Sequence, residues 1–199
     1  MADRHNILGV AEGMRPFLFD FDDYERLDHA GVFADQHGRV ELIEGVIVHM
    51  APQGFDHTNV TSDLTVGLGI AVRGLTESGF KVLTQGTLRI GNHSAPEPDV
   101  FVVRRTERKK YYEAADAVLV VEVSISTADA DKTVKAPLYA RAGVPELWIV
   151  EPEQASVTLY RGPRPDGTWD DVTTVTAGKV SPLFSPEIAI VLADLFPAA

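Results

Sequence analysis

Two acidic residues lie in or beside strongly apolar stretches of this chain. Glu122 stands inside Leu119–Val123, an otherwise unbroken apolar run, and such a run predicts a buried strand. Asp99 directly precedes a second short apolar run, Val100–Val103. Because an unpaired carboxylate in a buried strand costs several kcal/mol, each acid needs a partner such as a metal ion or a lysine. The two acids together therefore predict a metal site.

Apolar periodicity and turn residues predict the elements that would hold these acids. We expect helices over residues 21–30, from Asp56 as N-cap to about residue 75, and over roughly 132–142, with a regular start near Val134 because Pro137 interrupts helical hydrogen bonding. A hairpin over residues 39–50 would turn at Glu44–Gly45. Further strands are expected at 81–84, 87–90, 100–103, 119–123, 147–150 and 157–160, with C-terminal edge strands near 172–175 and 188–191. This order predicts an α/β fold, a sheet with helices on its faces.

The composition is that of an ordinary globular protein. The 199 residues are 45% hydrophobic and 24% charged, so we expect one domain over residues 1–199. The absence of cysteine excludes disulfides and cysteine nucleophiles. The sequence has neither an apolar stretch of about 18 residues nor a signal-peptide pattern at its start, so we expect no membrane partner and a cytoplasmic location.

The charge of the chain argues against general binding of nucleic acids. At a formal net charge of −11, the protein as a whole repels phosphate backbones, whose binding depends on lysine and arginine contacts. One local exception is a basic segment, Arg104–Arg105 with Arg108–Lys110, followed by the aromatic pair Tyr111–Tyr112. This segment could bind a nucleic-acid strand, or it could be a solvated loop.

Several separated motifs recur in an order that is typical of one family. They are Glu41–Gly45, His57, Pro98–Val100, Leu119–Ser124, Asp131 with Lys135 and Tyr139, and Ala142–Trp148. Over about residues 20–160 the chain resembles the Uma2 family of restriction-endonuclease-like proteins, within the PD-(D/E)XK nuclease superfamily. The resemblance implies a restriction-endonuclease-like core with a central mixed sheet flanked by helices, an N-terminal hairpin and C-terminal edge strands. It also implies a metal-dependent endonuclease that hydrolyses phosphodiester bonds in DNA.

The chemistry of that superfamily assigns roles to the two acids. A carboxylate-bound Mg²⁺ (or Mn²⁺) can neutralise a phosphate and activate water, and one or two carboxylates suffice to hold it. By the resemblance, Asp99 and Glu122 are the metal ligands. Related nucleases carry a lysine two residues after the second acid, where this chain has Ser124. The resemblance implies that this lysine lies instead on the following helix, at Lys135, with Lys132 as the alternative.

Further site residues are less strongly determined. Glu44, in the family's Glu-Leu-x-acid-Gly pattern, is the candidate third acid, with Glu41 beside it; a solvated turn acid is the other interpretation of Glu44. His57 could act as a proton shuttle or as a group supporting the acids, or it could be a core or capping histidine. Gln85 could line the same edge of the sheet.

Two functions from different classes follow from these patterns. The first is a metal-dependent DNA endonuclease with Asp99, Glu122, Lys135, Glu44 and His57 in its catalytic site, acting as a homodimer because cutting a duplex needs two sites. The second is a catalytically idle interaction or regulatory protein that retains the fold, which the acidic charge favours.

Overall fold

The computed structural model describes residues 16–75, 79–125 and 128–196. Its contacts divide the chain into two compact units, and we describe each by itself. The hairpin unit comprises Met1–Pro52 and Ile90–Pro96, and the sheet unit comprises Gln53–Arg89 and Glu97–Ala199. Two compact units can still belong to one cooperatively folding domain, so the assignment of a single domain stays a prediction.

The hairpin unit contains one helix and one antiparallel strand pair. Helix α1 spans Phe21–His29 behind a capping box formed by Asp20 and Asp23. Strands β1 (Arg39–Ile43) and β2 (Val46–Met50) pair through the turn that was predicted. Its two central residues, Glu44 and Gly45, have φ of 49° and 85°, the left-handed backbone that two-residue hairpin turns need.

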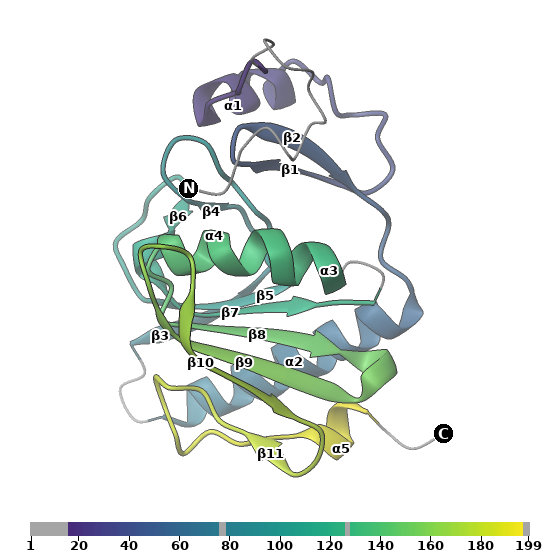
Figure 1. Ribbon diagram of the computed structural model, residues 1–199, viewed down its shortest axis with the longest axis vertical. Coiled ribbons are helices and arrows are strands. Elements are labelled where there is room, and N and C mark those ends of the chain that lie inside the picture. Colours follow the sequence, from purple (N-terminus) through teal and green to yellow (C-terminus); the bar gives the residue numbers. More distant parts are fainter. Residues whose placement is uncertain (1–15, 76–78, 126–127, 197–199) are drawn as a thin grey trace. The chain divides into compact units, whose positions relative to one another are not determined.

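The sheet unit is built on a six-stranded mixed sheet in the order β10-β9-β8-β7-β5-β3 (Figure 1). Only the neighbours β7 and β8 run parallel, and the other pairs are antiparallel. The strands are β3 (Phe80–Thr84), β5 (Val100–Arg104), β7 (Ala117–Val123), β8 (Glu146–Glu151), β9 (Ser156–Pro163) and β10 (Trp169–Val175). This sheet confirms the predicted α/β class, and β10 confirms one of the two predicted edge strands.

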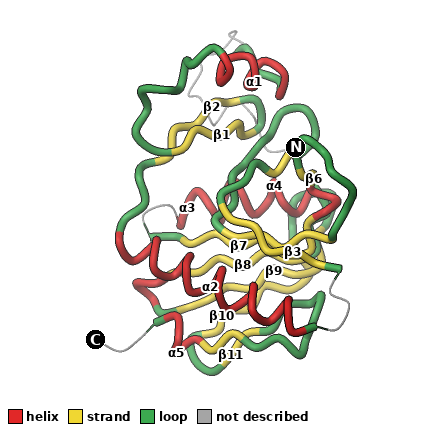
Figure 2. Tube along the Cα trace, turned by 180° about the vertical axis from the view of Figure 1, so that it is seen from behind, coloured by secondary structure: helices red, strands yellow, loops and turns green. Residues whose placement is uncertain are grey.

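Helices cover both faces of this sheet. Helix α2 (Phe55–Gly74) lies on one face, and a helix formed by α3 (Ala128–Ala130), a π-helical segment (Asp131–Lys135) and α4 (Ala136–Arg141) lies on the other, as the two opposite views show (Figures 1 and 2). The central strand β7 is buried at every residue, because it has strand neighbours on both sides and helices on both faces. Alternation along β7 sends Val121 and Val123 into the core with α2 and Glu122 toward α4.

Pro137 explains the unusual form of the second helix. Proline has no N–H, and its ring clashes with the carbonyl four residues earlier. Directly before it, the N–H of Ala136 donates to the carbonyl of Asp131, a π-helical bond. The first helical turn begins at Ala128, earlier than the predicted start at residue 132. The regular helix α4 begins at Ala136 and not at the predicted Val134. The predicted end of this helix near residue 142 is confirmed, since α4 ends at Arg141 and Gly143 just beyond it takes a left-handed φ of 74°.

Three predicted boundaries were wrong. Helix α2 begins at Phe55 with the extended residue Gly54 as its N-cap, so the predicted N-cap Asp56 lies inside the helix. The predicted strand at 87–90 is the two-residue β4 (Leu88–Arg89), which pairs with β6 (Tyr112–Glu113) outside the main sheet. The predicted edge strand near 188–191 is the two-residue β12 (Ile190–Val191), which pairs with β11 (Lys179–Val180) outside the main sheet and is followed directly by helix α5 (Leu192–Leu195).

Two short 3₁₀ turns complete the sheet unit, at Ala114–Asp116 and Pro152–Gln154. Within the ranges that the structure describes, no helix is long and apolar enough to cross a membrane.

Candidate active site

The two acids singled out by the sequence lie at one end of the sheet, where β5 begins and β7 ends. The strands are antiparallel, and Val100 pairs with Val121, so the next position on each strand brings Asp99 opposite Glu122. A hydrogen bond fixes this relation. The N–H of Val123, part of the peptide bond that follows Glu122, donates to Oδ2 of Asp99 over 2.8 Å. The carboxylate of Asp99 therefore contacts the backbone of the residue next to Glu122.

Asp99 is held mainly by one side chain from the start of α2 and one from the loop before it. Nε2 of His57 lies 3.1 Å from Oδ2 of Asp99, and Nε2 of Gln53 donates to Oδ1 over 3.0 Å. Gln85 in turn donates to Oε1 of Gln53 over 2.9 Å, which places Gln85 at this edge of the sheet as expected. The acid is buried, so its orientation is set by these donors.

The orientation of His57 is also fixed. Oγ1 of Thr61, one helical turn later, lies 3.3 Å from Nδ1 of His57. In either charge state of the ring, Nε2–H can donate to Asp99 while Nδ1 faces Thr61. Both side chains are buried. His57 therefore supports Asp99 directly and is not an isolated core histidine.

Glu122 is held by the helix on the opposite face. Oε1 of Glu122 accepts a 2.6 Å hydrogen bond from the hydroxyl of Tyr139, and Nζ of Lys135 lies 3.3 Å from the same oxygen. The side chains of Lys135 and Glu122 are 6% and 3% exposed. Nζ of Lys135 also lies 4.0 Å from Oδ1 of Asp131, and Asp131 accepts a 2.6 Å bond from Oγ of Ser124.

These contacts distinguish the two candidate lysines. Lys132 pairs with Oε1 of Glu151 at 2.6 Å, and its side chain is 37% exposed. Lys135 is the lysine whose ammonium lies beside Glu122. The hydroxyl of Ser124 donates to Asp131 and so ties the residue after β7 to the helix that carries Lys135.

The remaining acidic candidates lie in the hairpin unit. Glu44 is in the turn between β1 and β2, where its N–H donates to Oγ of Ser94 over 2.9 Å. Glu41 is buried within β1. Because both belong to a different compact unit from Asp99 and Glu122, their part in the site stays a prediction.

The basic segment after β5 is largely exposed. Lys109 is bound by Asp116 at 2.6 Å, and the hydrogen bond to that carboxylate raises the pKa of Lys109. Lys110 lies over the ring of Tyr111, 5.3 Å from its centroid. The segment's binding to a nucleic acid stays a prediction.

Sequence reasoning did not assign roles to Gln53, Tyr139, Asp131 or Thr61. A signal existed for three of them. Asp131, Lys135 and Tyr139 follow one another at intervals of four residues and so share one helical face. Thr61 stands in the same relation to His57. Gln53 lies in a loop before α2 and carries no periodic signal.

The donor chemistry of this site fits a hard divalent cation. Asp99 and Glu122 offer carboxylate oxygens, the hard ligands that such a cation prefers. Mg²⁺ keeps several waters and needs only one or two carboxylates. Over residues 16–75, 79–125 and 128–196, no cluster of three or more His, Asp or Glu side chains could hold a metal.

The fold matches a nuclease-like structure. A crystal structure described as that of "a putative nuclease belonging to DUF820 from Anabaena variabilis ATCC 29413" is similar to this chain with a TM-score of 0.67 and 20% identity, over 89% of this chain and 97% of that one. At this identity the likeness shows the shared fold. A search of curated proteins found no match.

The chain belongs to the Uma2 family. The family model, described as "Putative restriction endonuclease", matches residues 21–193. This match confirms the resemblance found in the sequence and extends it beyond residue 160, through the C-terminal strands.

Proposed function

We propose that this protein is a divalent-metal-dependent endonuclease of the PD-(D/E)XK type that hydrolyses phosphodiester bonds in DNA. One observation carries the proposal. Nζ of Lys135 lies beside the carboxylate of Glu122, and the N–H of the next residue, Val123, donates to Asp99. Two carboxylates can hold a divalent cation that neutralises phosphate and activates water, and an ammonium group beside them can balance developing negative charge. The family description and the nuclease-like fold support the same activity.

Asp99 and Glu122 would hold the cation, Mg²⁺ or Mn²⁺. When bound, such a cation neutralises phosphate charge and lowers the pKa of water. Lys135 would orient the attacking water and balance the charge that develops on the phosphate. His57 would keep the Asp99 carboxylate oriented toward the cation, in the way that outer hydrogen-bond partners orient metal ligands. Glu44 would be an accessory acid.

A plasmid assay tests the proposal. Supercoiled DNA, single-stranded DNA and RNA are each incubated with the protein and Mg²⁺ or Mn²⁺, and strand breaks are counted on gels. We expect nicking or cleavage of the plasmid by the wild type and a loss of about 100-fold or more in Glu122→Gln and Lys135→Met. The matched control is Lys132→Met, which removes the same charge one helical turn away and should retain activity within about threefold.

Two results would overturn the proposal. One is the absence of cleavage of every substrate by folded wild-type protein with either metal. The other is equal cleavage by the wild type, Glu122→Gln and Lys135→Met, which would indicate a contaminating nuclease. Circular dichroism of each variant separates loss of chemistry from loss of fold.

The partner and assembly follow from the same proposal. We expect DNA as the substrate. Because cutting both strands of a duplex requires two active sites, we also expect a homodimer as the active form. Light scattering coupled to gel filtration would detect a particle of twice the chain mass.

A second candidate function is an idle interaction module. It is favoured by the net charge of −11, which repels DNA, and by the fact that Asp99 and Glu122 already accept hydrogen bonds from His57, Tyr139 and other groups of the chain. Under this alternative both acids serve the fold, and folded protein neither cuts DNA nor binds Mn²⁺ saturably.

A further inference from the structure

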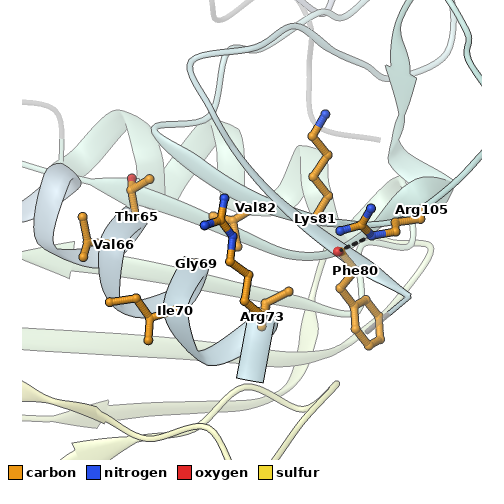
Figure 3. Close-up of a pocket in the computed structure, with 10 residues that line it drawn as sticks. Thr65, Val66, Gly69, Ile70, Arg73, Phe80, Lys81, Val82 and Arg105 are labelled. Carbon is orange, nitrogen blue, oxygen red and sulfur yellow. Dashed lines mark hydrogen bonds between the residues drawn. The ribbon is translucent and has the colours of Figure 1, made fainter. Parts of the chain in front are cut away.

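A pocket of about 550 Å³ lies between the second half of α2 and the edge strand β3 (Figure 3). Along the sheet, this pocket is separate from Asp99 and Glu122. Asp99 lies next to the Thr84 end of β3, because Thr84 pairs with Val100, whereas the pocket is lined by residues Phe80 to Val82. At about 3.3 Å per residue, the two ends of β3 lie roughly 13 Å apart.

The lining of this pocket carries three cations, Arg73, Lys81 and Arg105, and none of its ten residues is acidic. This composition is unusual for a protein with a net charge of −11. A concave site whose charge has one sign raises the local concentration of the opposite ion. The pocket is therefore suited to an anion.

Two of the three cations reach the pocket from different elements, Arg73 from α2 and Arg105 from the segment after β5. In Figure 3 the side chain of Arg73 rises from α2 beside Val82, Arg105 lies near Phe80, and the ammonium of Lys81 extends away from α2. Nε of Arg105 donates to the carbonyl of Phe80 over 3.1 Å, which anchors this side chain on β3. A guanidinium forms paired hydrogen bonds with phosphate oxygens, so two arginines on one cavity favour a phosphate group.

The other side of the pocket is apolar and open. Val66 and Ile70, one turn apart on α2, are 56% and 68% exposed. Gly69 lies between them, and a side-chain carbon built on it would meet nothing within 4 Å. A ligand that fits here carries both an anionic group and a flat or apolar body. The volume lies in the range of about 300–1,000 Å³ that small-molecule sites occupy.

We propose that this pocket binds a nucleotide, with its phosphate on Arg73 and Arg105 and its base against Val66 and Ile70. The inference rests on the proposed function, because phosphodiester hydrolysis makes nucleic-acid strands and their products the phosphate esters that this protein meets. The nucleotide could be free or part of a DNA strand whose scissile phosphate lies at the acid pair.

Binding without catalysis tests the inference. Calorimetric titrations with dTMP and with a short oligo-dT are made without divalent metal, on the wild type and on Glu122→Gln. We expect Glu122→Gln to bind as the wild type does, and Arg73→Gln and Arg105→Gln to bind at least about 10-fold more weakly. Lys179→Gln is the matched control, because it removes the same charge from an exposed side chain of β11 that does not line the pocket; the affinity of this variant should change by less than about threefold.

Comparing dTMP with oligo-dT distinguishes binding of a free nucleotide from binding of a nucleotide within a DNA strand. Equal affinity for dTMP and the oligonucleotide points to a free nucleotide, and binding of the oligonucleotide alone points to a strand; both support the pocket provided that the arginine variants weaken the binding. Equal weakening in all three charge variants, tighter binding of octanoate than of dTMP, or no binding would overturn it. If DNA is cut normally while Arg73→Gln and Arg105→Gln retain full nucleotide affinity, the inference fails and the proposed function stands.

Discussion

The ammonium group of Lys135 lies 3.3 Å from Oε1 of Glu122, and both side chains are almost completely buried. The pair joins the π-helical segment before α4 to the central strand β7. Removing one member of a buried ion pair leaves the other charge uncompensated, whereas removing both does not.

This asymmetry predicts the stabilities of two variants. Lys135→Met should destabilise the protein by about 3–5 kcal/mol, and the double variant Glu122→Gln/Lys135→Met should recover a large part of that loss. Urea unfolding followed by circular dichroism measures both. Strictly additive effects of the two substitutions would contradict a direct pairing.

Tyr139→Phe should weaken the site and retain the fold. It removes only the hydroxyl that donates to Glu122 over 2.6 Å, a hydrogen bond to a charged group that contributes about 1.5–3 kcal/mol. We expect lower unfolding free energy and slower plasmid cleavage. The control is Tyr24→Phe, which removes a hydroxyl bound to the carbonyl of Val40 and should leave cleavage unchanged. Loss of cleavage in both variants alike would contradict a specific role for Tyr139.

His57→Phe should weaken metal binding by a larger free energy than it removes from the free energy of unfolding. Its Nε2 contact with Asp99 orients that carboxylate, and loss of such a partner typically costs 10–100-fold in metal affinity. Isothermal titration with Mn²⁺ measures the change, and exposed His29→Gln serves as the control. Unchanged affinity in folded His57→Phe would mean that the histidine only packs in the core.

Glu44→Asn tests the accessory acid without breaking its turn. Asparagine tolerates the left-handed backbone that Glu44 adopts at φ 49°, so the hairpin should remain. We expect cleavage to fall by about 10-fold and the melting temperature to stay within a few degrees. Full cleavage activity would identify Glu44 as a solvated turn residue.

The sequence predicted the strands that carry the site because their signals are local. The apolar run around Glu122 and the short run after Asp99 each fill one buried strand, and neighbouring β8 is likewise continuous and apolar. The hairpin turn was predictable because Gly45 follows Glu44 directly.

The features that sequence reasoning missed depend on tertiary contacts. The π-helical turn at Asp131–Lys135 precedes a proline whose effect on helix geometry depends on how the helix packs. Gln53 reaches Asp99 from a loop 46 residues away in sequence, and no pattern in the chain marks such a contact.

The most direct test is a Mn²⁺ titration followed by electron paramagnetic resonance, which counts free Mn²⁺ in the presence of folded protein. If Asp99 and Glu122 share one cation, the wild type removes Mn²⁺ from solution saturably, and Asp99→Asn and Glu122→Gln each abolish that binding while circular dichroism stays native. Saturable binding that survives in both variants, or none in the wild type, would contradict a shared metal site.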